Sequence, residues 1–144
     1  TFVFGYPGTT KQFLTSDAVN YIQNIEDPTR IKLRTARLDV YNRAMNESPA
    51  QRLRYASKVA SVANGWKKWQ GEVRGLKRLN AIEKKKAFEK DFNAWAKNNA
   101  KYKNVLSELK TTYAEMEKAN MSYTYLNEAV FASDLMIQVR FYDL

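Results

Sequence analysis

One segment of the sequence carries a regular apolar pattern that restricts what the chain can fold into. Between residues 55 and 76, large apolar side chains recur at alternating spacings of four and three residues. This spacing is typical of a helix that packs one seam against a neighbouring helix. The preceding Ser48-Pro49 is a strong helix start, because serine caps helices and proline fits their first turn. The seam consists of Tyr55, Val59, Val62, Trp66, Trp69, Val73 and Leu76.

The first third of the chain shows similar start signals. Ser16 is a candidate cap for a short helix over about 17–23, and Asp27-Pro28 predicts a second helix that runs to about residue 46. Glycine and proline number only 5 and 3, which disfavours an all-β chain with many tight turns.

The helix that starts at Pro49 has the largest predicted length. The apolar pattern resumes at Phe88, Phe92 and Trp95. If the helix is continuous to Asn98, it is roughly 75 Å long at about 1.5 Å per residue. Such a helix projects from a compact globule or leans on a partner.

Two further helices are predicted in the C-terminal third. One carries the spacing of four and three again, and the last begins near Ser122 and is apolar almost all round, which indicates burial on more than one side. The predicted fold class is therefore all-α, an antiparallel bundle of long helices. The first pattern comprises Tyr102, Leu106, Leu109, Tyr113 and Met116, and the second Leu126, Val130, Ile137 and Phe141.

The N-terminal residues have a different character. Phe2-Val3-Phe4 followed by Gly5-Tyr6-Pro7-Gly8 is typical of a strand that ends in a turn. We therefore divide the chain into residues 1–12, the end of a strand and a linker, and residues 13–144, a helical domain. The chain looks like part of a larger protein, and we expect the helical domain to be incomplete.

The absence of two residue types limits the chemistry. The sequence has no cysteine and no histidine. Thiolate nucleophiles, cysteine-based zinc sites and an imidazole base are therefore excluded within these residues. We predict no catalytic residue, no metal site and no cofactor in this chain.

The face of the long helix opposite the apolar seam is lined with small residues. Ala56, Ala60, Gly71 and Gly75 fall with Asn64 within an arc of about 100°. Asn64 offers a carbonyl acceptor and an amide donor in the middle of this face. By pattern alone a second helix–helix contact is the favoured interpretation, and a substrate-binding role for Asn64 is the alternative.

The positive charge of the chain is concentrated. The net charge is +9, and residues 52–90 alone contain twelve Lys/Arg against three Glu. A basic helical module that binds nucleic acid is one alternative function. A structural domain that oligomerises through its apolar seams is another. A solvated basic surface is the usual explanation for such a run.

Four stretches together resemble one known family. They are residues 2–10 (FVFGYPGTT), 24–34 (NIEDPTRIKLR), 63–72 (ANGWKKWQGE) and 75–79 (GLKRL). In this order they resemble the bacterial dipeptidyl-peptidase 7 and 11 family, family 46 of the serine peptidases. Beyond Lys84 only the helical character is similar.

The resemblance implies a fold and a role. Enzymes of that family have a chymotrypsin-like double barrel with a helical domain inserted between the catalytic Asp and Ser. The helical domain closes the cleft, so that substrates are cut two residues from a free N-terminus. An asparagine of the long helix helps to hold the substrate's α-amino group, and Asn64 matches it.

The resemblance also implies the context of the chain. The implied partners are a peptide N-terminus and the barrel of the same polypeptide. The resemblance also admits a homodimer of the whole protein, and it implies no nucleic-acid partner and no membrane span. The expected location is periplasmic, cell-surface or secreted. The triad lies outside these residues, so the chain alone should be inactive. Acidic and hydrophobic specificity are not distinguished, because the family's barrel selects that residue.

Overall fold

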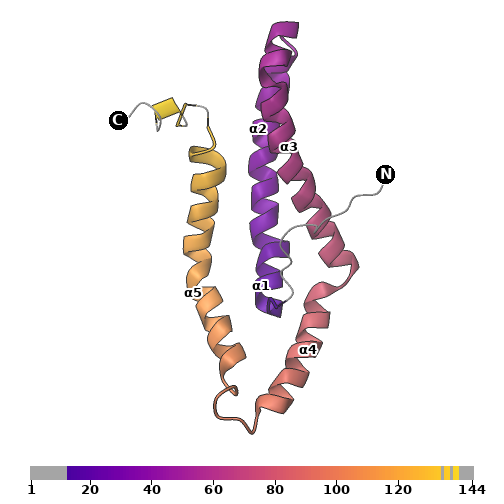
Figure 1. The fold of residues 1–144 in the computed structure, drawn as a ribbon, viewed down its shortest axis with the longest axis vertical. Helices are drawn as coiled ribbons and strands as arrows, with labels where there is room; N and C mark the ends of the chain where they lie inside the picture. The colour runs from indigo at the N-terminus through magenta and orange to yellow at the C-terminus, as the bar shows by residue number, and fades with distance from the viewer. Residues whose placement is uncertain (1–12, 134, 137, 140–144) are drawn as a thin grey trace, which may run out of the picture.

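The chain folds into helices that pack mainly in one antiparallel pair. The computed structural model describes residues 13–133, 135–136 and 138–139. Over these residues the structure is all-α, which confirms the predicted fold class (Figure 1). The predicted strand at Phe2–Phe4 lies outside the described residues. The elements are α1 (Ser16–Tyr21), η1 (Ile22–Glu26), α2 (Asp27–Met45), α3 (Pro49–Arg78), α4 (Ala81–Ala96), α5 (Val105–Tyr125) and η2 (Leu126–Val130), where η denotes a π-helical turn.

The first two predicted helices are a single helical rod. The π turn η1 joins α1 to α2, and the Asp27 N–H bonds to the carbonyl of Ile22. The prediction of a cap at Asp27 is therefore wrong. Pro28 has no N–H to donate and its ring crowds the preceding turn, and the wider π turn accommodates it without ending the helix. The cap of α1 is Thr15, whose side chain accepts from the Ala18 N–H, rather than Ser16.

The apolar seam of α3 packs on α2, as the spacing predicts. Ser48 caps α3 by accepting a hydrogen bond from the Gln51 N–H at 3.2 Å. Val62 and Trp69 are buried in the interface between the two helices. Near the turn that joins them, the rings of Tyr41 and Tyr55 lie 5.5 Å apart. In Figure 1 the two helices run antiparallel from this turn and diverge toward the other end of α3.

The long helix is not continuous to Asn98. It ends at Arg78, and α4 begins at Ala81. Between them Asn80 adopts the left-handed conformation, with φ 50° and ψ 47°. On an unbroken helix Phe88 would lie about 120° around the axis from Leu76, so one straight helix cannot keep both on one seam. The bend instead brings α4 back toward α1.

A carboxylate of α4 holds this helix against the start of α1. Glu89 accepts from the hydroxyl of Ser16 at 2.6 Å and also from the Ser16 N–H. Ser16 is buried, so this pair satisfies polar groups at the base of α1. The contact explains why Ser16 does not act as the cap of its own helix.

The C-terminal helix is long and largely exposed. The prediction that a separate helix starts near Ser122 is wrong, because α5 continues through that residue into η2. Leu126 and Val130 are 44% and 40% exposed. The apolar surface expected to be covered is therefore open in this chain, whereas Ile137 and Phe141 lie outside the described residues. No helix among the described residues has the length and apolarity needed to cross a lipid bilayer.

The left-handed residue at the bend gives a test. Asn80→Ala should lower the free energy of unfolding by about 1 kcal/mol, because a Cβ without a local hydrogen-bonding group is disfavoured at positive φ. Asn80→Gly should leave stability unchanged or raise it. Urea unfolding followed by circular dichroism measures both, with Asn93→Ala on the exposed side of α4 as control. Equal stabilities of the alanine and glycine variants at position 80 would contradict the bend.

Candidate functional site

In the α2–α3 interface, a tryptophan of α3 is covered by two arginines of α2. Trp69 is 8% exposed, and the guanidinium carbons of Arg30 and Arg34 lie 5.2 and 4.3 Å from its ring. One turn earlier on α3, the indole N–H of Trp66 donates to the hydroxyl of Thr35 at 2.8 Å. The positive side chains stabilise the electron-rich ring face while their stems fill the interface.

Asn64 lies on the other side of this turn and faces solvent. Its side chain is exposed, as are Ala60 and Gly71 on the same face. A Cβ added at Gly71 or Gly75 would meet no atom within 4 Å. Over the described part of the chain, then, no second helix packs on the small-residue face. The amide of Asn64 has no hydrogen-bond partner among these residues and is available to a ligand.

Directly next to Asn64, the helix touches an arginine of α2. A Cβ added at Gly65 would lie well inside van der Waals distance of Arg34 Nη1. The same Nη1 donates to the carbonyl oxygen of Val62 at 3.1 Å. Glycine at position 65 leaves room for the end of the Arg34 side chain, and α3 continues through this residue without a break.

Arg34 also reaches the C-terminal segment. Its Nε and Nη2 donate to the two carboxylate oxygens of Glu128 at 2.8 and 3.0 Å. The side chains of Arg34 and Glu128 are only 19% and 13% exposed. One turn along α2, Arg37 donates to the carbonyl oxygen of Ala132 at 3.1 Å. The turn of α3 that bears Asn64 is thus connected through α2 to η2.

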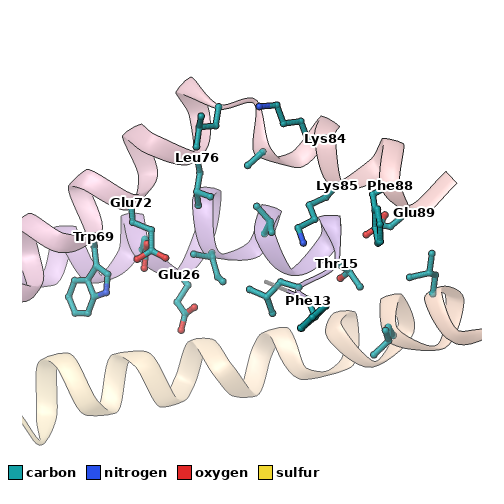
Figure 2. Close-up of a pocket in the computed structure, with 18 of the residues that line it drawn as sticks. Phe13, Thr15, Glu26, Trp69, Glu72, Leu76, Lys84, Lys85, Phe88 and Glu89 are labelled. Atoms are coloured by element: carbon teal, nitrogen blue, oxygen red, sulfur yellow. The ribbon is translucent and has the colours of Figure 1, made fainter. Parts of the chain in front are cut away.

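A separate cavity of about 950 Å³ opens between the α3–α4 bend, the α1–α2 rod and α5. Figure 2 shows Trp69, Glu72 and Glu26 at one end of it and Phe88 and Glu89 at the other. Its lining is largely apolar and does not include Asn64. The sequence-predicted site and this cavity are therefore different places.

The polar end of the cavity contains a buried acid. Asp27 is 1% exposed, and its Oδ2 has no hydrogen-bond partner. Burial raises the pKa of its carboxyl from 3.8 to about 7; Glu72 adds to the rise, whereas Arg30 opposes it. The Arg30 guanidinium lies 2.7 Å from Glu26 and 3.8 Å from Asp27. These charges form a structural ion network at the base of α2.

The basic stretch, residues 52–90, is divided between α3 and α4. Lys86 pairs with Glu83 at 2.8 Å. Lys68, Lys84 and Lys85 lie around the cavity with the acids described above. Because the cations are spread over two helices and mixed with carboxylates, the arrangement does not favour the nucleic-acid alternative.

Comparisons with a family model and with individual proteins agree on one family. The family model described as Peptidase S46 matches residues 1–141. The chain belongs to the Peptidase S46 family. It is 45% identical over 134 residues to the Asp/Glu-specific dipeptidyl-peptidase of Flavobacterium psychrophilum, covering 90% of this chain and 19% of that protein. It is 41% identical over 138 residues to dipeptidyl-peptidase 7 of Porphyromonas gingivalis, covering 93% and 19%.

The match covers only one part of each relative. The chain spans about a fifth of the length of these Peptidase S46 proteins. Two of the stretches that carry the resemblance meet across the interface at Trp69: residues 24–34 lie in η1 and α2, and residues 63–72 lie in α3. The family resemblance of this chain therefore includes one contact surface of the fold.

Sequence reasoning missed Arg34, Glu128 and Asp27. A signal was present on α2, where Asp27, Arg30, Arg34 and buried Leu38 follow each other at spacings of three and four. Charges on the core-facing side of a helix indicate buried ion pairs. The partner Glu128 had no comparable signal, because it lies 94 residues away in sequence.

The buried acid predicts a pH effect. Between pH 4 and 7 the folded chain keeps a proton on Asp27 that the unfolded chain releases, so stability should fall as pH rises through this window. Asp27→Asn cannot ionise and should flatten the dependence, with a gain on the order of a few kcal/mol at pH 8. Urea unfolding at several pH values measures this, with exposed Asp39→Asn as control. An unchanged slope in the Asp27 variant would refute the assignment.

The glycines of α3 give a matched pair. Gly71→Ala should stabilise the chain by roughly 0.5–1 kcal/mol, because alanine is the better helix former and the space is open. Gly65→Ala should forgo this gain and lose up to about 1 kcal/mol, since the methyl group pushes Nη1 of Arg34 away from the Val62 carbonyl. Equal gains at both positions would show that the Arg34 contact has no energetic weight.

Proposed function

We propose that this chain is the helical cap of a serine-type dipeptidyl aminopeptidase, and that Asn64 binds the α-amino group of the peptide substrate. Family membership supports the reaction, because the relatives that it matches are named dipeptidyl-peptidases. The observation that carries the site is the exposure of the Asn64 amide on an open face of small residues. A helix face packed by another helix would not admit a substrate.

The chemistry of the site suits an ammonium group. An ammonium ion carries donors only, and the side-chain carbonyl of Asn64 is a neutral acceptor that avoids the desolvation cost of a buried ion pair. A hydrogen bond to a charged group contributes about 1.5–3 kcal/mol. Holding the N-terminus at a fixed point sets which peptide bond reaches the nucleophile, so the site measures two residues from the amine.

The other parts of the enzyme lie outside these residues in this proposal. A chymotrypsin-like barrel of the same polypeptide supplies His, Asp and Ser, since this chain has no histidine. The cap closes the cleft over that barrel, and the whole protein is periplasmic, cell-surface or secreted. Proteins named Asp/Glu-specific dipeptidyl-peptidase and dipeptidyl-peptidase 7 match this chain at 45% and 41% identity. We therefore assign the choice of the residue before the cut to the barrel.

The proposal is tested on Asn64 in the full-length protein. Asn64→Ala should raise KM for a dipeptidyl substrate with a free N-terminus by roughly 10- to 100-fold, with little change in kcat, because the lost bond holds ground and transition state alike. Steady-state kinetics with a fluorogenic dipeptide measures this. In the unmodified enzyme an N-acetylated substrate should have a higher KM than the free-amino substrate. In the variant this difference should disappear.

The control lies on the same face of α3. Ser57→Ala, two turns before Asn64 and also exposed, should leave both kinetic constants within twofold of the unmodified enzyme. Unchanged KM in Asn64→Ala, with activity otherwise intact, would rule out the amino-group role.

A further inference from the structure

Arg34 uses its whole guanidinium group to join three elements. Nε and Nη2 form a two-pronged pair with Glu128 of η2, and Nη1 donates to the Val62 carbonyl of α3. The guanidinium carbon also lies over the Trp69 ring of α3, 4.3 Å from its centroid. A lysine would carry the same charge but lacks the planar fork that makes these contacts together.

The contacts to α3 flank Asn64 in the sequence. Val62 lies two residues before it and Gly65 directly after it, and both touch Nη1 of Arg34. The Val62 carbonyl is the one that accepts from residue 66 within an α-helix, so Arg34 adds a second donor to it. Two points of one helical turn are thus held from the α2 side while Asn64 faces solvent from the same turn.

Glu128 holds Arg34 in this geometry. Both carboxylate oxygens are used, and the pair is mostly shielded from solvent, with side chains 19% and 13% exposed. Charge-assisted pairs with this two-pronged arrangement fix orientation as well as adding energy. Without Glu128, an arginine side chain has many rotamers that do not reach Val62.

We propose that Arg34, held by Glu128, is a positioning residue for Asn64, so that amino-group binding depends on this pair although neither residue touches the substrate. This inference rests on the proposed function of Asn64. The pair fixes the turn of α3 from 62 to 65 relative to α2 and η2. Loosening it lets Asn64 move away from the place where the substrate's ammonium group arrives, and binding weakens while the chemical step is unchanged.

A double-mutant cycle in the full-length enzyme tests the proposal. Arg34→Lys and Glu128→Gln should each raise KM for the free-amino dipeptide substrate by roughly 5- to 10-fold and leave kcat within twofold. In an Asn64→Ala background the same changes should add less than twofold, because nothing remains to be positioned. Arg43→Lys, an exposed arginine on the same helix, is the matched control and should change neither constant.

A second variant keeps the test independent of the ion pair. Gly65→Ala changes no charge but displaces Nη1 of Arg34. It should raise KM as Arg34→Lys does, and this rise should be absent in the Asn64→Ala background. If Arg34→Lys fails to fold, Gly65→Ala replaces it in the cycle. Melting temperatures of all variants are measured alongside.

The outcomes separate the two proposals. If Asn64→Ala raises KM and Arg34→Lys adds its full effect on top, the positioning role is overturned and the amino-group role stands. An unchanged KM in Arg34→Lys and Gly65→Ala also overturns the positioning role alone. If Asn64→Ala itself has no effect, both proposals are overturned.

Discussion

The packing of Trp69 beneath Arg30 and Arg34 is the interaction on which the rest of this structure depends. It lies in the interface between α2 and α3, and it places two arginines on the core-facing side of α2. Each guanidinium then needs an acid. Arg30 pairs with Glu26 and Asp27, and Arg34 with Glu128. Two ion networks thus lie beside one aromatic ring.

Both networks lie beside π-helical turns. Glu26 is in η1 and Glu128 is in η2, and each turn contains one residue more than an α-helical turn would hold. The extra residue rotates the side chains that follow it around the helix axis. In η1 this accommodates Pro28 and leaves Asp27 buried with a raised pKa. In η2 the Phe131 N–H bonds to the Leu126 carbonyl at 2.8 Å, and Glu128 points at α2. Both π turns thus lie beside ion pairs that are largely shielded from solvent.

The two sides of α3 have different roles because the helix is asymmetric. Its bulky seam is buried on α2, and this contact supplies the stability that a helix with three internal glycines lacks. Its small-residue side is left open, so a ligand can approach the backbone closely around Asn64. Arg34 connects the two sides at the turn from 62 to 65. On α5, apolar side chains such as Met116 and Tyr123 are 47% and 67% exposed, so part of the apolar surface of this helix is not buried against the described residues.

The sequence by itself determined the helical class, the start of α3 at Ser48-Pro49 and the buried seam through Val62 and Trp69, because these follow from local capping and from a periodicity that is independent of the partner. It also singled out Asn64, through the small face and the family resemblance, though its role stays a prediction. Tertiary structure alone decided the break at Asn80, the continuous rod through Asp27 and the pairing of Arg34 with Glu128. Each of these depends on the fit between segments far apart in the chain, where the geometry of contact outweighs local helix propensity.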